Sequence, residues 1–151
     1  MSKRIDPNQV VAVVGTKYPK PHDAPCLRRE RKRLGDLANL TQFGVNMLRL
    51  PPGVWSSQRH WHTAEDEFVF VVEGEVVLVT AEGEEVLRAG ECAGFKANDP
   101  NGHHLQNRSA RDAVLLEVGS RSSQDGVDYP DIDMRIDPGS DRYIRRDGTP
   151  Y

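Results

Sequence analysis

Turn residues divide the middle of the chain into short apolar runs, and this spacing is the strongest constraint on its fold. Between residues 39 and 119 the runs recur at roughly the 8–12-residue interval of a β-sandwich or barrel. None shows a sustained helical period of about 3.6 residues. We expect strands over residues 44–50, 56–62, 67–72, 75–80, 85–88, 91–95, 103–108 and 113–118. The pattern therefore predicts an all-β fold, with a hairpin turn at residues 81–84.

Three zones follow from this pattern in a chain of 151 residues, a length that fits one domain. Residues 1–38 are expected to be an irregular lead-in that packs on the barrel or on a partner subunit. Residues 39–119 are expected to form the barrel. Residues 120–151 are polar and offer few core residues, so we expect a tail that wraps the barrel or a neighbouring subunit. Its expected anchors are Tyr129, Tyr143 and Tyr151.

Residues 27–36 carry five basic side chains. We interpret this segment as a solvated turn or short helix, because it has no aromatic neighbours to stack on bases and the net charge of the chain is −3. The longest apolar runs are far shorter than a membrane span. We therefore expect the chain to bind neither nucleic acid nor a membrane.

The two cysteines, Cys26 and Cys92, are too few for a disulfide framework. Cys92 is expected to be a small core residue, since no base is found to activate it. Residues 1–7 carry charge with no apolar segment behind them, so we expect no signal peptide. Together these features predict a cytoplasmic protein with reduced thiols.

Four of the five histidines fall in two clusters, and the first cluster lies beside several carboxylates. His60 and His62 are two residues apart on a predicted strand, so their side chains point to the same face. Glu67 lies five residues after His62, and a turn between them would bring its carboxylate back on the adjacent strand. Glu65 and Asp66 are its rivals for this role, although we expect them to cap the turn or face solvent.

The second cluster, His103 and His104, can supply a third imidazole from a later strand. Neighbouring residues on a strand face opposite sides, so only one of the two points inward unless a bulge intervenes. We favour His103, because choosing His104 would turn Arg108 inward and bury a guanidinium without a partner. Three imidazoles and one carboxylate suit Fe, Mn, Ni, Co or Zn as a divalent ion. The predicted metal site consists of His60, His62, Glu67 and His103.

The first cluster resembles the first motif of the cupin superfamily. The pattern His60-x-His62-x4-Glu67-x6-Gly74 matches that motif position by position. Gly53 is one residue further from His60 than the usual pattern places it.

The second cluster resembles the second cupin motif. His103-x3-Asn107 matches its end, and Gly90 resembles the glycine near its start. Lys96 stands where a proline is common, and residues 99–102 look like a short insertion. A bulge at this insertion would shift the register by one residue and favour the neighbouring histidine, so the choice of His103 stays a prediction.

The resemblance covers roughly residues 40–119, and the flanks resemble those of small single-domain bacterial cupins. It implies a double-stranded β-helix, or jelly-roll barrel, with a metal ion inside, and commonly a homodimer. The exposed sheet face and the apolar residues 10–14 would supply the dimer contact. The expected function is that of a metal-dependent enzyme on a small oxygenated metabolite, either isomerase-like on a sugar phosphate or dioxygenase-like. The alternative is a non-catalytic cupin that binds or senses a metabolite.

Gln58 is the candidate catalytic residue, because it shares the predicted inward face of His60 and its amide could orient a substrate carbonyl or hydroxyl. Its alternative role is to fix an imidazole tautomer. Isomerisation of a sugar phosphate also needs a cationic anchor, and the basic residues near the two motifs are Arg49, Arg59 and Lys96. Arg59 is expected to point outward by parity with the neighbouring histidine, which weakens the isomerase hypothesis.

Overall fold

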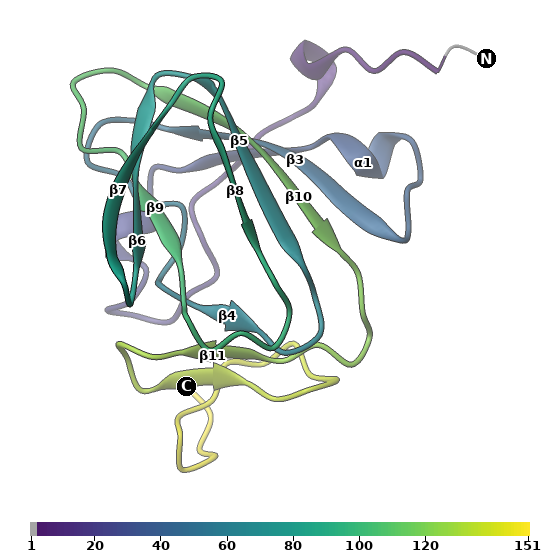
Figure 1. Ribbon diagram of the computed structural model, residues 1–151. Coiled ribbons are helices and arrows are strands. Elements are labelled where there is room, and N and C mark those ends of the chain that lie inside the picture. Colours follow the sequence, from purple (N-terminus) through teal and green to yellow (C-terminus); the bar gives the residue numbers. More distant parts are fainter. Residues whose placement is uncertain (1–2) are drawn as a thin grey trace.

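The computed structural model describes residues 3–151 and consists mainly of short strands in three antiparallel sheets (Figure 1). The largest sheet has the strand order β1 (Val13–Val14), β2 (Glu30–Arg33), β3 (Phe43–Leu50), β10 (Ala113–Ser120), β5 (Glu67–Glu73) and β8 (Cys92–Phe95). The second has the order β7 (Gly83–Arg88), β6 (Glu75–Thr80) and β9 (His104–Gln106). The third has the order β12 (Met134–Ile136), β11 (Val127–Tyr129) and β4 (Trp61–His62). The predicted all-β class is confirmed.

Helical structure is limited to single turns within residues 3–151. These are η1 (Pro7–Gln9), η2 (Ala24–Cys26) and α1 (Leu34–Leu37). None of the helices in the described part of the chain is long and apolar enough to span a membrane. Met1 and Ser2, which belong to the predicted lead-in, lie outside the described residues.

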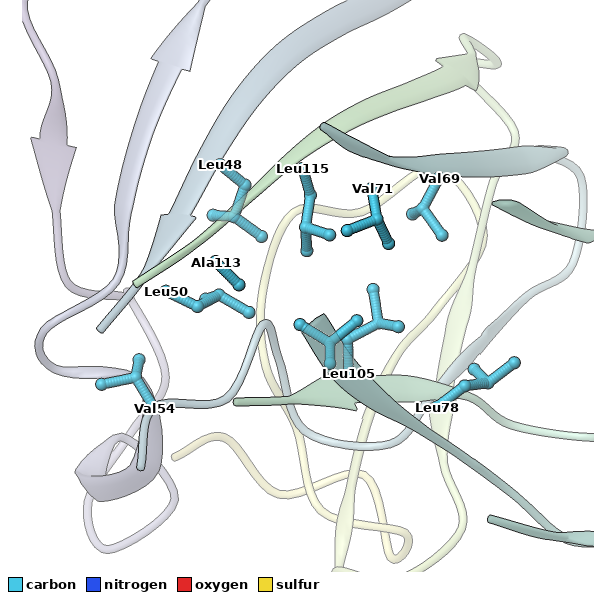
Figure 2. Packing of buried hydrophobic residues seen from close by; sticks show 10 residues of the cluster. Leu48, Leu50, Val54, Val69, Val71, Leu78, Leu105, Ala113 and Leu115 are labelled. Atoms are coloured by element: carbon cyan, nitrogen blue, oxygen red, sulfur yellow. The ribbon is translucent and has the colours of Figure 1, made fainter. Parts of the chain in front are cut away.

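The main core lies between the six-stranded sheet and the sheet formed by β7, β6 and β9, whose inward side chains face each other (Figure 2). Leu48, Leu115 and Val71 point inward from three neighbouring strands, because directly paired residues share a face and Leu115 pairs with both others. Leu78 and Leu105 point toward them from the second sheet. Each fully buried aliphatic side chain contributes about 1.5–3 kcal/mol to stability. This apolar contact holds the two sheets together.

The inward face changes from apolar to polar along three neighbouring strands. Two residues before Leu48, β3 carries Asn46; two residues after Leu115, β10 carries Glu117; and two residues before the buried Val69, β5 begins with Glu67. Because side chains alternate along a strand, these polar groups lie on the same interior face as the core. One end of the interior is therefore lined by polar side chains, whereas the other end is filled by apolar ones.

The lead-in adds two strands to the edge of the largest sheet, so the interpretation of residues 27–36 as a solvated turn or short helix is wrong for residues 30–33. There β2 pairs with β3, which satisfies backbone groups that would otherwise form a free edge. Arg31 is paired with the inward Leu48, so it faces the interior. Arg29 is only 8% exposed. Only residues 34–37 form the expected helical turn.

The tail forms a second small core, so the expectation of few core residues there is wrong. Val127, Tyr129 and Met134 are buried, and partly buried side chains pack against them. Tyr18 of the lead-in contacts Tyr129 edge-on, with ring centroids 5.7 Å apart, and Tyr143 at 5.6 Å. The lead-in and the tail thus meet at one end of the two facing sheets. The zone boundaries at residues 38 and 119 remain predictions.

Two further local predictions are corrected. The strand expected over residues 56–62 is mostly loop; strand β4 covers only its last two residues, and single bridges join Trp55 to Gln106 and His60 to His103. Cys92 is exposed rather than in the core, because it pairs with the outward-facing Phe70 on β5.

Candidate metal centre

The carboxylate of Glu67 lies among three imidazoles. Nε2 of His103 is 2.9 Å from Oε2 of Glu67. Nε2 of His60 is 3.5 Å from the same oxygen, and Nε2 of His62 is 3.4 Å from Oε1. The folded chain therefore brings together all four side chains of the predicted metal site, from two loops and from β4 and β5.

This arrangement fits a divalent metal ion. Oε2 of Glu67 is buried and accepts no hydrogen bond from any residue in the described range 3–151, although imidazole nitrogens lie close to it. A buried carboxylate oxygen without a partner is costly. One ligand atom from each of His60, His62 and Glu67 lies within 4.8 Å of the others. Imidazole nitrogen with one carboxylate oxygen is a common donor set for first-row divalent metals.

Two of the imidazoles are held in the tautomer that a metal ion needs. Nδ1 of His62 is 2.6 Å from Oδ2 of Asp125, and Nδ1 of His60 is 2.9 Å from the backbone oxygen of Gln58. With Nδ1 donating to these oxygens, Nε2 faces Glu67 and can bind a metal ion once it carries no proton. Asp125 was missed by sequence reasoning, because it lies in the tail and carries no local motif.

The neighbouring carboxylates have other partners. Asp66 accepts hydrogen bonds from the backbone nitrogen of Ala97 at 2.8 Å and from Nζ of Lys96 at 3.0 Å. Glu65 accepts from the backbone nitrogen of Ser122 at 2.8 Å. Both carboxylates stabilise loops. One ligand atom of Glu65 also lies within 4.8 Å of ligand atoms of His62 and Asp125, so Glu65 remains an alternative carboxylate ligand.

The charges in this cluster are strongly coupled. Burial alone would raise the pKa of Glu67, but the surrounding imidazoles hold it well below its ordinary value. Burial lowers the pKa of His103 to about 4, despite the nearby Glu67. For His62 burial is outweighed by Glu67 and Asp125, which raise its pKa to about 9. At neutral pH and without a metal ion, the cluster thus has an ionised carboxylate, a neutral His103 and a protonated His62, which must release its proton when a metal ion binds.

The adjacent histidines face opposite sides. The ring of His103 stacks on Phe95, with centroids 3.5 Å apart and planes 2° from parallel. His104 points away from Glu67, where its Nδ1 lies 2.9 Å from the backbone oxygen of Ser57 and its ring packs edge-on against Trp55. The residue placed beside Glu67 is therefore the one that the sequence favours.

Gln58 and Asn107 lie away from the cluster. Nε2 of Gln58 donates to the backbone oxygen of His22 at 2.7 Å, which ties the loop before His60 to the lead-in. Nδ2 of Asn107 donates to the backbone oxygens of Leu50 and Arg111, both at 2.7 Å. A catalytic role for Gln58 stays a prediction, and its contact favours a positioning role.

A cavity of about 540 Å³ opens beside the cluster. Its wall includes His60, His62 and Glu67, together with Glu117. Four guanidinium groups line other parts of the same cavity; they belong to Arg29, Arg31, Arg33 and Arg121. Three phenol rings complete it, those of Tyr18, Tyr129 and Tyr143. A smaller cavity of about 170 Å³, with Lys96 at its edge, also touches Glu67 and His103.

The basic residues expected to anchor a phosphate are bound elsewhere. Arg49 pairs with Asp112 at 3.2 Å, and Lys96 pairs with Asp66. Arg59 holds Asp131 through two contacts of 2.7 Å. None of these three lines the larger cavity. The arginines that do line it come from the lead-in and the start of the tail, outside both motifs. Three of them lie in a segment with charge on both faces, so no apolar period marks it in the sequence.

Known proteins resemble this chain in sequence and in fold. Residues 46–119 match the family model of the cupin domain. A cupin-superfamily sugar phosphate isomerase from Silicibacter pomeroyi is 42% identical, with a TM-score of 0.92 and coverage of 98% of this chain and 96% of that chain. A proposed sugar phosphate isomerase from Acidithiobacillus ferrooxidans is 27% identical, with a TM-score of 0.73 and coverage of 82% and 80%.

More distant structures share the fold alone. The polyketide cyclase RemF from Streptomyces resistomycificus is 18% identical, with a TM-score of 0.64 and coverage of 80% of both chains. No curated protein sequence matches the chain.

Proposed function

Because this chain belongs to the cupin superfamily, we propose that it is a metal-dependent enzyme that isomerises a small sugar phosphate. The observation that carries the proposal is the position of three imidazoles around the Glu67 carboxylate, whose Oε2 atom is buried without a hydrogen-bond partner among the described residues, at the wall of a cavity large enough for a small metabolite. His60, His62, Glu67 and His103 would hold the ion. The bound ion would polarise a carbonyl and lower the pKa of a neighbouring hydroxyl.

Isomerisation of a hydroxy-carbonyl compound moves one hydrogen between adjacent carbons and the hydroxyl proton between their two oxygens, and it needs neither oxidant nor reductant. The chain must therefore supply a group that takes a proton from one carbon and returns it to the next. Glu117 is the carboxylate on the cavity wall that is bound neither in the metal cluster nor to a loop. Its oxygens accept from Arg31 at 2.9 and 3.1 Å, which fixes the direction of the carboxylate on the cavity wall. We assign the proton transfer to Glu117.

The comparisons support this reaction over dioxygenation. The Silicibacter protein, described as a sugar phosphate isomerase, matches this chain over nearly its full length. The Acidithiobacillus protein has the same proposed activity and more than 25% identity. The arginine-lined cavity is consistent with a phosphorylated substrate. No feature of the described residues favours dioxygenation.

The test begins with metal analysis of protein purified without a nickel column. The protein is then loaded with Mn(II) or Zn(II) and incubated with individual aldose and ketose phosphates in D2O. Proton NMR should show deuterium entering the carbon next to the carbonyl as the isomers interconvert. Glu117→Gln should abolish exchange and retain the metal, whereas Glu67→Gln should lose metal.

Metal-loaded protein that exchanges no carbon-bound hydrogen in any aldose or ketose phosphate would overturn the isomerase. If such a compound still bound, the non-catalytic metabolite-binding cupin would replace it. We also propose that the protein is cytoplasmic and forms a homodimer.

A further inference from the structure

The lead-in presents a row of arginines to the cavity. Arg29, Arg31 and Arg33 alternate along one chain segment, so their side chains share a face. The pairing of Arg31 with Leu48 and of Arg33 with Asn46 directs that face into the interior. All three guanidinium groups line the cavity that also contains Glu67. The row therefore faces the space in which a substrate of the candidate metal centre would lie.

The first two arginines already have partners. Arg29 donates to the backbone oxygens of Gly15 and Ser56, and it forms no ion pair with a carboxylate among residues 3–151. Its buried charge is therefore not neutralised. Arg31 holds Glu117 through two contacts. Burial lowers the pKa of Arg31, but the charges of Glu117 and Glu67 outweigh burial and raise it.

Arg33 and Arg121 keep free donor capacity. The nearest carboxylate oxygen to Arg33 belongs to Asp36 and is 4.0 Å away, and the side chain of Arg33 is 60% exposed. For Arg121 the contact is with Glu65 at 3.9 Å, and the side chain is 50% exposed. Neither contact has hydrogen-bond length. Both guanidinium groups are thus available to an anion that enters the cavity.

A glycine makes room for one of these groups. Gly44 lies two residues before Asn46 on β3, so it is on the same inward face, and it pairs with Gly119 on β10. A Cβ atom on Gly44 would collide with the guanidinium of Arg121. The φ angle of Gly44 is not in the left-handed region, so only space requires glycine here. Because Gly44 has no side chain, the guanidinium of Arg121 can occupy this position beside the cavity.

The charge of the cavity favours an anion. Its wall carries four guanidinium groups against three carboxylates, those of Glu65, Glu67 and Glu117. A divalent cation at the candidate metal centre would raise the excess of positive charge further. Guanidinium groups bind phosphate oxygens through paired hydrogen bonds, which are stronger than those between neutral groups.

We propose that Arg33 and Arg121, supported by the charges of Arg29 and Arg31, form a binding site for the phosphate dianion of a phosphate monoester at the mouth of this cavity. The site rests on the proposed function in one respect only, that the phosphate belongs to the substrate of the metal centre. The binding of phosphate itself depends on the arginines and needs no turnover.

Titration calorimetry with inorganic phosphate tests the site on chelator-treated protein and on Mn(II)-loaded protein. Saturable binding is expected in both, and it should be tighter with Mn(II). Arg33→Ala and Arg121→Ala should each weaken binding by about 10- to 100-fold, because each removes a charged hydrogen bond. Gly44→Ala keeps every charge but displaces Arg121, so it should also weaken binding. Arg49→Ala, an exposed arginine paired with Asp112 outside the cavity, is the matched control and should bind like the unaltered protein.

Melting curves establish that each variant is folded before it is titrated. No saturable phosphate binding to either form, or equal affinity in Arg33→Ala, Arg121→Ala and Arg49→Ala, would overturn the site. Phosphate binding that requires these arginines in a protein without isomerase activity would leave the site standing and reject the proposed reaction. Isomerisation of unphosphorylated sugars by a protein that binds no phosphate would reject the phosphate site and leave an isomerase reaction standing.

Discussion

Asp125 and His62 are joined by a contact of 2.6 Å between Oδ2 and Nδ1. The other oxygen, Oδ1, accepts from the backbone nitrogens of Ala64 at 2.8 Å and Glu65 at 3.2 Å. The carboxylate is thereby fixed in direction, and it fixes the imidazole in turn. A residue of the tail thus orients a candidate metal ligand of the barrel.

Asp125→Ala should lower metal affinity by about 10- to 100-fold, the usual cost of losing a carboxylate that orients a ligating histidine. Asp125→Asn keeps an acceptor oxygen and should recover part of that loss. Titration with Mn(II) or Zn(II) measures both. Asp112→Asn, at an exposed ion pair, is the control. Equal affinity in all four proteins would show that the contact has no role in metal binding.

Removing the metal should lower the melting temperature. A ligand present at one hundred times its Kd adds about 2.7 kcal/mol of stability. For a chain of this length that corresponds to roughly 5–10 °C. Scanning calorimetry before and after chelation, and again after adding Mn(II), measures the shift. Glu67→Gln should melt at the same temperature with and without metal. An unaltered protein that contains no metal and gains no stability from it would have no metal site.

His103→Ala should reduce metal affinity far more than His104→Ala, because only the first imidazole lies beside Glu67. His104 is buried against Trp55, so its loss should reduce thermal stability instead. Metal titration and melting of the two variants separate these effects. The reverse order of metal affinities would contradict the register of this segment.

The two thiols should differ in reactivity. Burial raises the pKa of Cys26 to about 11, although Arg29 and Arg31 oppose the shift. A raised pKa keeps the thiol protonated, so at pH 8 the nucleophilic thiolate of Cys26 is scarce, and its reactivity should rise toward pH 11. Ellman's reagent at pH 8 should titrate one thiol in the folded protein and two in denaturant. The folded Cys92→Ser variant should have no thiol that reacts rapidly. Two rapidly reacting thiols in the folded, unaltered protein would contradict the burial of Cys26.

The outer face of the largest sheet should mediate a homodimer. Phe68, Phe70 and Val72 point outward from β5 and are 41%, 37% and 48% exposed. Apolar groups clustered on a sheet face are a usual contact between protein chains. Light scattering should give about twice the 16.9 kDa of one chain, and Phe70→Glu should shift the mass toward a monomer. A mass of one chain at micromolar concentration would reject the dimer.

The gathering of His60, His62 and Glu67 could be predicted because the three residues lie close together in the sequence. His103 could be added from the expected orientation of its segment and from the resemblance of that segment to the second motif. Strand β2 could not be predicted, because Arg29, Arg31 and Arg33 alternate with Glu30 and Lys32. With charge on both faces, no apolar period marks the strand. Asp125 was also out of reach, because its contact with His62 depends on how the tail folds back.

The tyrosine contacts at the cavity have a consequence for biosynthesis. Tyr18 precedes the candidate metal ligands in the sequence and Tyr143 follows them, yet their ring centroids lie 5.6 Å apart. On the ribosome, the strands that carry the candidate metal ligands emerge well before this wall can be completed. The nascent barrel would be able to gather its histidines while the cavity beside them was still open to water, and the enclosure would form only once the segment that carries Tyr143 had also emerged.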